Sequence, residues 1–133
     1  MTVLDTSDVV DFLVGEQCHA KVGALLQQEG TVAGPDLLVF EVVAAFRRQV
    51  QQHGMNPRRA KSAIEDLGDL PLEIFPALPL RARVWELRDN LTAADAFFVA
   101  LAERLDEPLA TKDRHLATAA RTHTSIQVIE LGP

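Results

Sequence analysis

Short apolar runs alternate with longer amphipathic stretches along the whole chain. The apolar runs predict β-strands at residues 3–4, 31–33, 72–75, 109–111 and 126–131. The stretches between them carry apolar residues three and four positions apart and predict α-helices at residues 6–13, 16–29, 36–52, 57–67, 80–88, 92–105 and 114–121. Strands that alternate with helices favour an α/β fold, in which helices cover both faces of a short, mostly parallel central sheet.

The chain has the organisation of one domain. It contains neither an internal repeat nor a linker-like stretch, and its 133 residues are the usual size of one compact unit. The predicted helix at 92–105 is apolar almost all round, which is typical of a helix that is buried in the interior. We therefore expect a single domain over residues 1–133 with this helix inside it.

Composition narrows the class of protein. The chain is 47% hydrophobic and 24% charged, which excludes an intrinsically disordered protein. Cys18 is the one cysteine, so an intramolecular disulfide is excluded and a reducing compartment is indicated. The N-terminus lacks the basic and apolar segments of a signal peptide, and the apolar stretch at 37–46 is too short to cross a membrane. These features predict a cytoplasmic protein with no membrane association.

Charge is distributed unevenly along the chain. The formal net charge is −6, which argues against indiscriminate binding to nucleic acid. Between residues 42 and 64, however, there is no acidic residue, and five basic residues fall in this window: Arg47, Arg48, Arg58, Arg59 and Lys61. Two interpretations remain open, an ordinary solvated helix face or an edge that contacts RNA phosphates or a partner protein.

Four acidic residues are embedded in apolar sequence. Asp5 and Asp113 each follow a predicted strand, and Asp95 opens the predicted buried helix. Each of these three could simply cap a helix, and Thr92 with Asp95 has the spacing of a capping box. Glu41 resists that explanation, because it is predicted to lie within a helix among apolar neighbours, where an ionised carboxylate must be paired, protonated or bound to metal.

The predicted topology brings these acids toward one place. In parallel α/β sheets, ligands bind outside the carboxyl ends of the strands, which is where Asp5 and Asp113 are expected. Glu41 and Asp95 lie on helices that could line the same crevice. Four carboxylates in one crevice repel one another and stay ionised together only around a hard cation such as Mg²⁺ or Mn²⁺.

Other chemistries find less support. The chain has no Gly-x-Ser-x-Gly motif and no glycine-rich phosphate loop, and Cys18 has only the adjacent His19 as a sequence-local base. The four histidines lack zinc-ligand spacing, and we expect them at the surface. Asp5 to Asp8 loosely resembles a haloacid-dehalogenase phosphatase, but Ser7 stands where that family has its second aspartate.

Several segments together resemble a known family. They are Val3-Leu4-Asp5-Thr6-Ser7, Phe40-Glu41-Val42, residues 91–96 with 100–103, and residues 108–117. In this order and spacing they resemble the PIN-domain family, and most closely the VapC-type toxins of bacterial VapBC toxin–antitoxin pairs. The resemblance covers essentially the whole chain. Two positions depart from the family pattern: Ala94, where relatives often carry an aromatic residue, and Asp8, where an apolar residue is more usual.

The resemblance implies a three-layer α/β/α PIN-like fold and a metal-dependent endoribonuclease that hydrolyses RNA phosphodiester bonds with a metal-activated water. Asp5, Glu41, Asp95 and Asp113 match the catalytic and metal-binding acids of the family, with Mg²⁺ or Mn²⁺ as the cofactor. Ser7 and Thr111 match hydroxyl positions near that site. The alternative is a PIN-fold subunit that acts mainly as a non-enzymatic partner-binding or repressor component, and the intact set of four acids argues against it.

The resemblance also implies partners, namely RNA as the substrate, a VapB-type antitoxin and a second copy of the chain in a homodimer. The early helices carry more apolar residues than one buried stripe needs: Val9, Val10, Phe12, Leu13, Val14, Leu25 and Leu26. We expect this surplus to form an exposed apolar groove beside Asp5, in which an amphipathic helix of the antitoxin could bind.

Overall fold

The computed structural model describes residues 1–132 of the chain, and five parallel strands form its central sheet. The strand order is β3-β2-β1-β4-β5. The strands are β1 (Val3–Leu4), β2 (Val32–Pro35), β3 (Leu72–Phe75), β4 (Leu109–Thr111) and β5 (Val128–Glu130). The central strands β1 and β4 pair with Val3 opposite Leu109 and Leu4 opposite Ala110. These residues are all buried, because helices cover both faces of the sheet.

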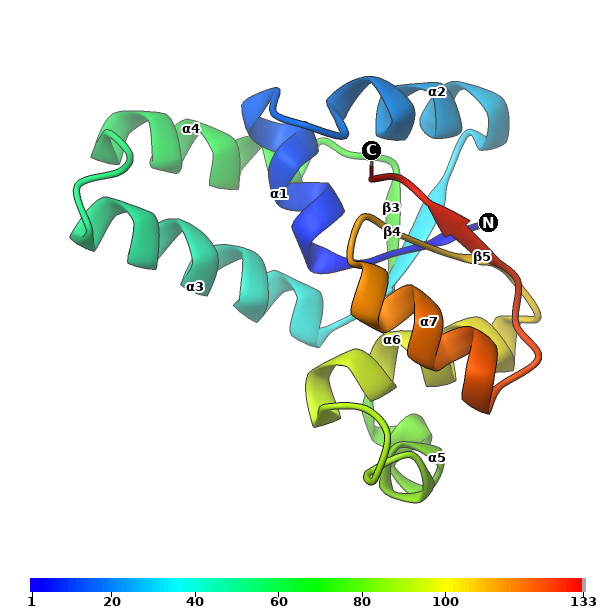
Figure 1. The fold of residues 1–133 in the computed structure, drawn as a ribbon. Coiled ribbons are helices and arrows are strands. Elements are labelled where there is room, and N and C mark those ends of the chain that lie inside the picture. The colour runs from blue at the N-terminus through cyan, green and yellow to red at the C-terminus, as the bar shows by residue number, and fades with distance from the viewer. Residues whose placement is uncertain (133) are drawn as a thin grey trace.

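Helices form a layer on each side of this sheet (Figure 1). One side carries α1 (Thr6–Val14) and α2 (His19–Glu29), and the α3–α4 pair (Leu37–Gln51 and Pro57–Leu67) packs against α1. The other side carries α5 (Arg81–Glu86), which follows a 3₁₀ turn at Leu78–Leu80, with α6 (Ala93–Leu105) and α7 (Arg114–His123). The predicted three-layer α/β/α architecture with a short parallel sheet is confirmed.

The predicted elements are all present, with shifted boundaries. Helix α2 begins at His19 because residues 16–18 form a turn after the left-handed Gly15 that ends α1. The predicted helix at 80–88 divides into the 3₁₀ turn and α5, which ends at Glu86. As predicted, α6 is buried, with Phe98, Val99 and Leu101 all inaccessible to solvent or nearly so. None of the helices in residues 1–132 is both long and apolar enough to span a membrane.

The prediction of surplus apolar residues on the early helices is wrong. Val9, Val10 and Leu13 are buried in the core, and Phe12 is half-buried with its ring stacked on His19. The physical reason is that α1 contacts α2, α3 and α4 as well as the sheet, so it needs apolar residues on several faces. Exposed apolar side chains gather instead on α3, where Val39, Phe40 and Val43 face solvent and Phe40 is 72% exposed.

Candidate functional site

A cleft of about 680 Å³ opens at the carboxyl ends of β1 and β4, and the four predicted carboxylates all line it. Asp5 lies between β1 and α1, Glu41 in the second turn of α3, Asp95 in the first turn of α6, and Asp113 at the N-cap of α7. Strands that run parallel end at the same edge of the sheet, so residues from opposite ends of the chain meet here.

Asp5 is the most deeply placed of the four, with 8% of its surface exposed. Its Oδ2 accepts hydrogen bonds from the Ser7 hydroxyl at 2.9 Å and from the Thr111 hydroxyl at 3.0 Å. Burial raises the pKa of Asp5, while these two hydroxyls oppose the rise. Ser7 and Thr111, which the sequence places near the site, therefore contact Asp5 directly and hold its carboxylate in one orientation.

Asp113 both caps a helix and faces the cleft. Its Oδ1 accepts hydrogen bonds from the amides of His115 at 2.9 Å and Leu116 at 3.2 Å, as an N-cap residue does. Its own amide donates to the Thr111 hydroxyl at 3.0 Å. Because that hydroxyl donates in turn to Asp5, Thr111 connects two of the four acids. The capping and site interpretations of Asp113 are thus compatible, since capping uses one carboxylate oxygen.

Glu41 is not the buried, isolated carboxylate that its apolar neighbours suggest. The side chain is half-buried, and its Oε1 accepts a hydrogen bond from the Thr6 hydroxyl at 2.6 Å. The neighbouring Phe40 is exposed and lines the same cleft, so Glu41 lies at the wall of the cleft beside an apolar side chain. Sequence reasoning missed Thr6, although its position directly after Asp5 could have indicated it.

Asp95 experiences the charge of all three other acids. Burial, followed by the negative charges of Asp5, Asp113 and Glu41, raises the pKa of Asp95 to about 6. Its backbone amide donates to the Thr92 hydroxyl at 3.2 Å, so the expected capping contact is also present. The four carboxylates therefore form one electrostatically coupled group at the cleft.

The donor chemistry of this group suits a hard divalent cation, because carboxylate oxygens are what Mg²⁺ and Mn²⁺ prefer. Three of the acids are oriented by hydroxyl or amide donors that occupy one oxygen each and leave the other available. As the side chains stand, however, no three Asp, Glu, His or Cys residues within 1–132 are grouped tightly enough to form a ready-made ligand set. The residues fit the cation by chemistry and by sharing a cleft, and binding would have to draw their free oxygens together.

The five basic residues of the window between 42 and 64 lie in different surroundings. Arg48 lines the acidic cleft, whereas Arg47 and Lys61 line an apolar groove of about 580 Å³ between α3 and α4. Arg59 donates to the carbonyl of Leu13, and Arg58 is exposed in the first turn of α4. The four histidines are exposed, as predicted. Of the five basic residues, the structure brings Arg48 to the carboxylates.

A network of buried polar side chains lies behind the cleft, and the sequence did not predict that these residues contact one another. Asp8, 0% exposed, accepts from the amide of Lys112 at 2.9 Å and from the Cys18 thiol at 3.7 Å. The Lys112 ammonium forms an ion pair with Asp11 at 2.8 Å. Burial, followed by the charge of Asp5, raises the pKa of Asp8 to about 8. The signal in the sequence was the acid at position 8, where an apolar residue was expected.

Known proteins match this chain over nearly its whole length. The family model of the PIN domain matches residues 2–122. The chain is 38% identical to Ribonuclease VapC1 of Mycobacterium tuberculosis over 96% of each chain, and 32% identical to Ribonuclease VapC12 of the same organism over 97% of this chain and 99% of that protein. The fold matches that of VapBC2 from Rickettsia felis bound to a DNA fragment from their promoter, with a TM-score of 0.67, 14% identity and 96% of each chain covered.

We expect the Asp8→Asn variant to be more stable than the wild type, and increasingly so as the pH rises. From about pH 4 to about pH 8 the folded protein retains the Asp8 proton that the unfolded chain has released, so the wild-type free energy of unfolding falls through this window. Asparagine cannot ionise, which removes this contribution. Thermal unfolding in a chelating buffer should show a Tm advantage that is larger at about pH 8 than at about pH 5.

Asp69→Asn is the matched control, because Asp69 is an exposed carboxylate beyond α4. Its Tm should follow that of the wild type at both pH values. An equal Tm advantage for Asp8→Asn at the two pH values would show that Asp8 titrates as an ordinary carboxylate.

Proposed function

The chain belongs to the PIN-domain family and to its VapC ribonucleases, and we propose that it is a metal-dependent endoribonuclease that acts as the toxin of a type II toxin–antitoxin pair. The observation that carries this proposal is the convergence of Asp5, Glu41, Asp95 and Asp113 on one cleft. A partner-binding or repressor component without catalysis would not need four coupled carboxylates, whose mutual repulsion destabilises the fold.

In this proposal the four acids hold Mg²⁺ or Mn²⁺. A bound divalent cation supplies an activated water near neutral pH and offsets the negative charge of the scissile phosphate. Asp95 or Asp113 would also orient the attacking water. Ser7 and Thr111 keep the Asp5 carboxylate in place, and Thr6 does the same for Glu41. An acidic protein can then act on a polyanion, since the cation inverts the local charge.

RNA is the proposed substrate, and Arg48 is the residue best placed to contact its phosphates at the cleft. Arg47, Arg58, Arg59 and Lys61 would extend the contact only if the RNA follows the α3–α4 pair away from the cleft. Arg59 is already engaged with a backbone carbonyl, and Arg47 and Lys61 border the apolar groove.

A VapB-type antitoxin is the proposed partner, by analogy with the toxin–antitoxin complexes whose toxin subunits share this fold. The apolar material for such a partner lies on α3 rather than on α1, since Val39, Phe40 and Val43 are exposed and the α3–α4 groove is adjacent. An arginine of the partner could then pair with the carboxylates of the cleft. We also propose that the protein forms a homodimer, as the family resemblance implies.

Replacing Asp95 by Asn should abolish RNA cleavage and leave the fold intact. We expect a loss of about 100-fold or more in kcat/KM, because even groups that only orient metal ligands contribute about 10- to 100-fold. Mg²⁺ or Mn²⁺ should raise the Tm of the wild-type protein, since a ligand that binds the folded state stabilises it, and should raise that of Asp95→Asn less.

The control for this experiment is again Asp69→Asn, which alters an equivalent charge outside the cleft. It should cleave RNA and respond to the cation as the wild type does. Full nuclease activity in Asp95→Asn would refute the assignment of Asp95. A wild-type protein that neither cleaves RNA nor responds to the cation would refute the proposed function.

Replacing Arg48 by Ala should weaken RNA binding and reduce the slope of log K against log salt by about one, the change expected for one lost phosphate contact. The comparison variant replaces Arg47, Arg58, Arg59 and Lys61 together by Ala and keeps Arg48. An unchanged slope in Arg48→Ala would exclude it as a phosphate contact. A reduced slope in the fourfold variant would show that the RNA also runs along α3 and α4.

A further inference from the structure

Asp8 is a fully buried carboxylate that does not line the acidic cleft. It lies in α1, one turn after Asp5, and its Oδ1 points at the turn between β4 and α7. That turn consists of Lys112 and Asp113, so the residue that Asp8 contacts is the direct neighbour of an acid proposed to bind the cation.

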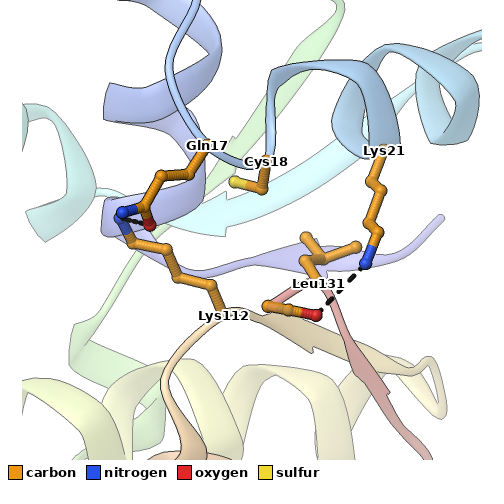
Figure 2. A pocket seen from close by; sticks show the side chains of 6 residues that line it. Gln17, Cys18, Lys21, Lys112 and Leu131 are labelled. Carbon is orange, nitrogen blue, oxygen red and sulfur yellow. Dashed lines mark hydrogen bonds between the residues drawn. The ribbon is translucent and has the colours of Figure 1, made fainter.

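Both ends of Lys112 are held by carboxylates of α1. Its backbone amide donates to Asp8 at 2.9 Å, and its ammonium donates to Asp11 at 2.8 Å. The ammonium also reaches the side-chain oxygen of Gln17 at 3.4 Å, and Cys18 lies beside this contact in the wall of the adjoining cavity (Figure 2). The thiol of Cys18 approaches Asp8 at 3.7 Å and Asp11 at 3.5 Å. The turn is therefore hydrogen-bonded to α1 through the amide and the ammonium of Lys112.

The same turn is also hydrogen-bonded to the sheet, through Thr111 at the end of β4. The Thr111 hydroxyl accepts from the amide of Asp113 at 3.0 Å and donates to Asp5. The Thr111 carbonyl accepts from the amide of Leu131 at 2.9 Å. Two successive amides, those of Lys112 and Asp113, thus bond to side chains rather than to a strand or helix ladder. The position of the Asp113 carboxylate depends on both of these bonds.

Asp8 holds this position at a cost to stability. Its Oδ2 has no hydrogen-bond partner within residues 1–132, and it lies near the negative charge of Asp5. An apolar side chain would avoid the burial of a carboxyl group that is only partly hydrogen-bonded, which is unfavourable. An apolar side chain, however, would leave the amide of Lys112 without an acceptor. Stability and the geometry of the turn therefore demand different residues at position 8.

We propose that Asp8 is a positioning residue, which sets the place of Asp113 in the cleft by accepting the backbone hydrogen bond of Lys112. This proposal rests on the proposed nuclease function for its catalytic consequence. It predicts that activity follows the presence of an acceptor at position 8 and does not follow stability, because the acceptor fixes the turn whereas the buried, partly unsatisfied carboxyl group weakens the fold.

The test compares Asp8→Asn with Asp8→Val in the full chain. The amide oxygen of asparagine can still accept from Lys112, so Asp8→Asn should keep most of the wild-type kcat. Valine cannot accept, so Asp8→Val should lose about 10-fold in kcat and in affinity for Mn²⁺, the lower end of the effect of groups that orient metal ligands. Its KM for RNA should stay unchanged. The amide resonances of Lys112 and Asp113 should move in Asp8→Val and stay near their wild-type positions in Asp8→Asn.

Thr2→Val is the control for a general loss of a buried polar contact. Thr2 is fully buried, and its hydroxyl bonds to Glu29 far from the cleft. This variant should change Tm without changing kcat or Mn²⁺ affinity. If Asp8→Val does not fold, Asp8→Ala removes the same acceptor with a smaller side chain.

Two results would overturn the proposal. One is wild-type kcat, Mn²⁺ affinity and amide resonances in Asp8→Val. The other is a loss of activity in Asp8→Val and Asp8→Asn alike that follows their Tm, as for a merely structural residue. If the wild type itself cleaves no RNA, the proposed function fails, while the amide resonances and Mn²⁺ affinity still decide whether Asp8 positions Asp113.

Discussion

Parallel pairing of β1 with β4 is the contact on which the site depends. It aligns Leu4 with Ala110 and thereby brings Asp5 and Thr111, which are 106 positions apart, within hydrogen-bond distance. The pairing holds because both strands are apolar and helices cover both faces of the sheet. Every other acid is then placed by a helix that begins near this edge, α3 for Glu41, α6 for Asp95 and α7 for Asp113.

The carboxylates at this edge are oriented mainly by neutral donors. The hydroxyls of Thr6, Ser7 and Thr111 and the first amides of α7 hold oxygens of three acids, and none of these donors neutralises a charge. The repulsion therefore persists, and after burial it is the second cause of the raised pKa of Asp95. Clustered carboxylates lower the free energy of unfolding because they repel one another. Functional sites often lower the stability of a protein in this way. In the proposed function, this charge serves to attract a cation.

The two basic residues that line the cleft, Lys112 and Arg48, lie in different surroundings. The Lys112 ammonium forms an ion pair with Asp11, so it helps to hold the turn between β4 and α7. It also offsets part of the negative charge behind the cleft. Arg48 is exposed at the rim of the cleft, where the proposed RNA substrate would meet it. Helix α3 likewise has one buried face and one exposed face. Its inner face carries Leu38, Val42 and Phe46 into the core, whereas Phe40 and Val43 remain exposed on the surface.

The sequence by itself determined the α/β class, the identity of every strand and the four acids of the cleft. Asp5 and Asp113 were predictable because they lie within two residues of the ends of apolar strands, and the carboxyl ends of parallel strands share one edge. Thr111 and Ser7 were identified by family resemblance. These features depend on local pattern and on order along the chain, which can be read without knowing how the helices pack.

Only the tertiary structure decided which side chains are buried and which are free. The apolar residues of α1 could not be assigned to the core from periodicity, because three other helices cover that helix from separate parts of the chain. The basic window reads as one cluster in sequence, yet packing of α3 on α4 divides it between a cleft, a groove and a backbone contact. The contact of Asp8 was equally hidden, because its partner Lys112 is 104 positions away and is brought to it by the sheet. Contacts of this range depend on the three-dimensional path of the chain, and no local pattern encodes them.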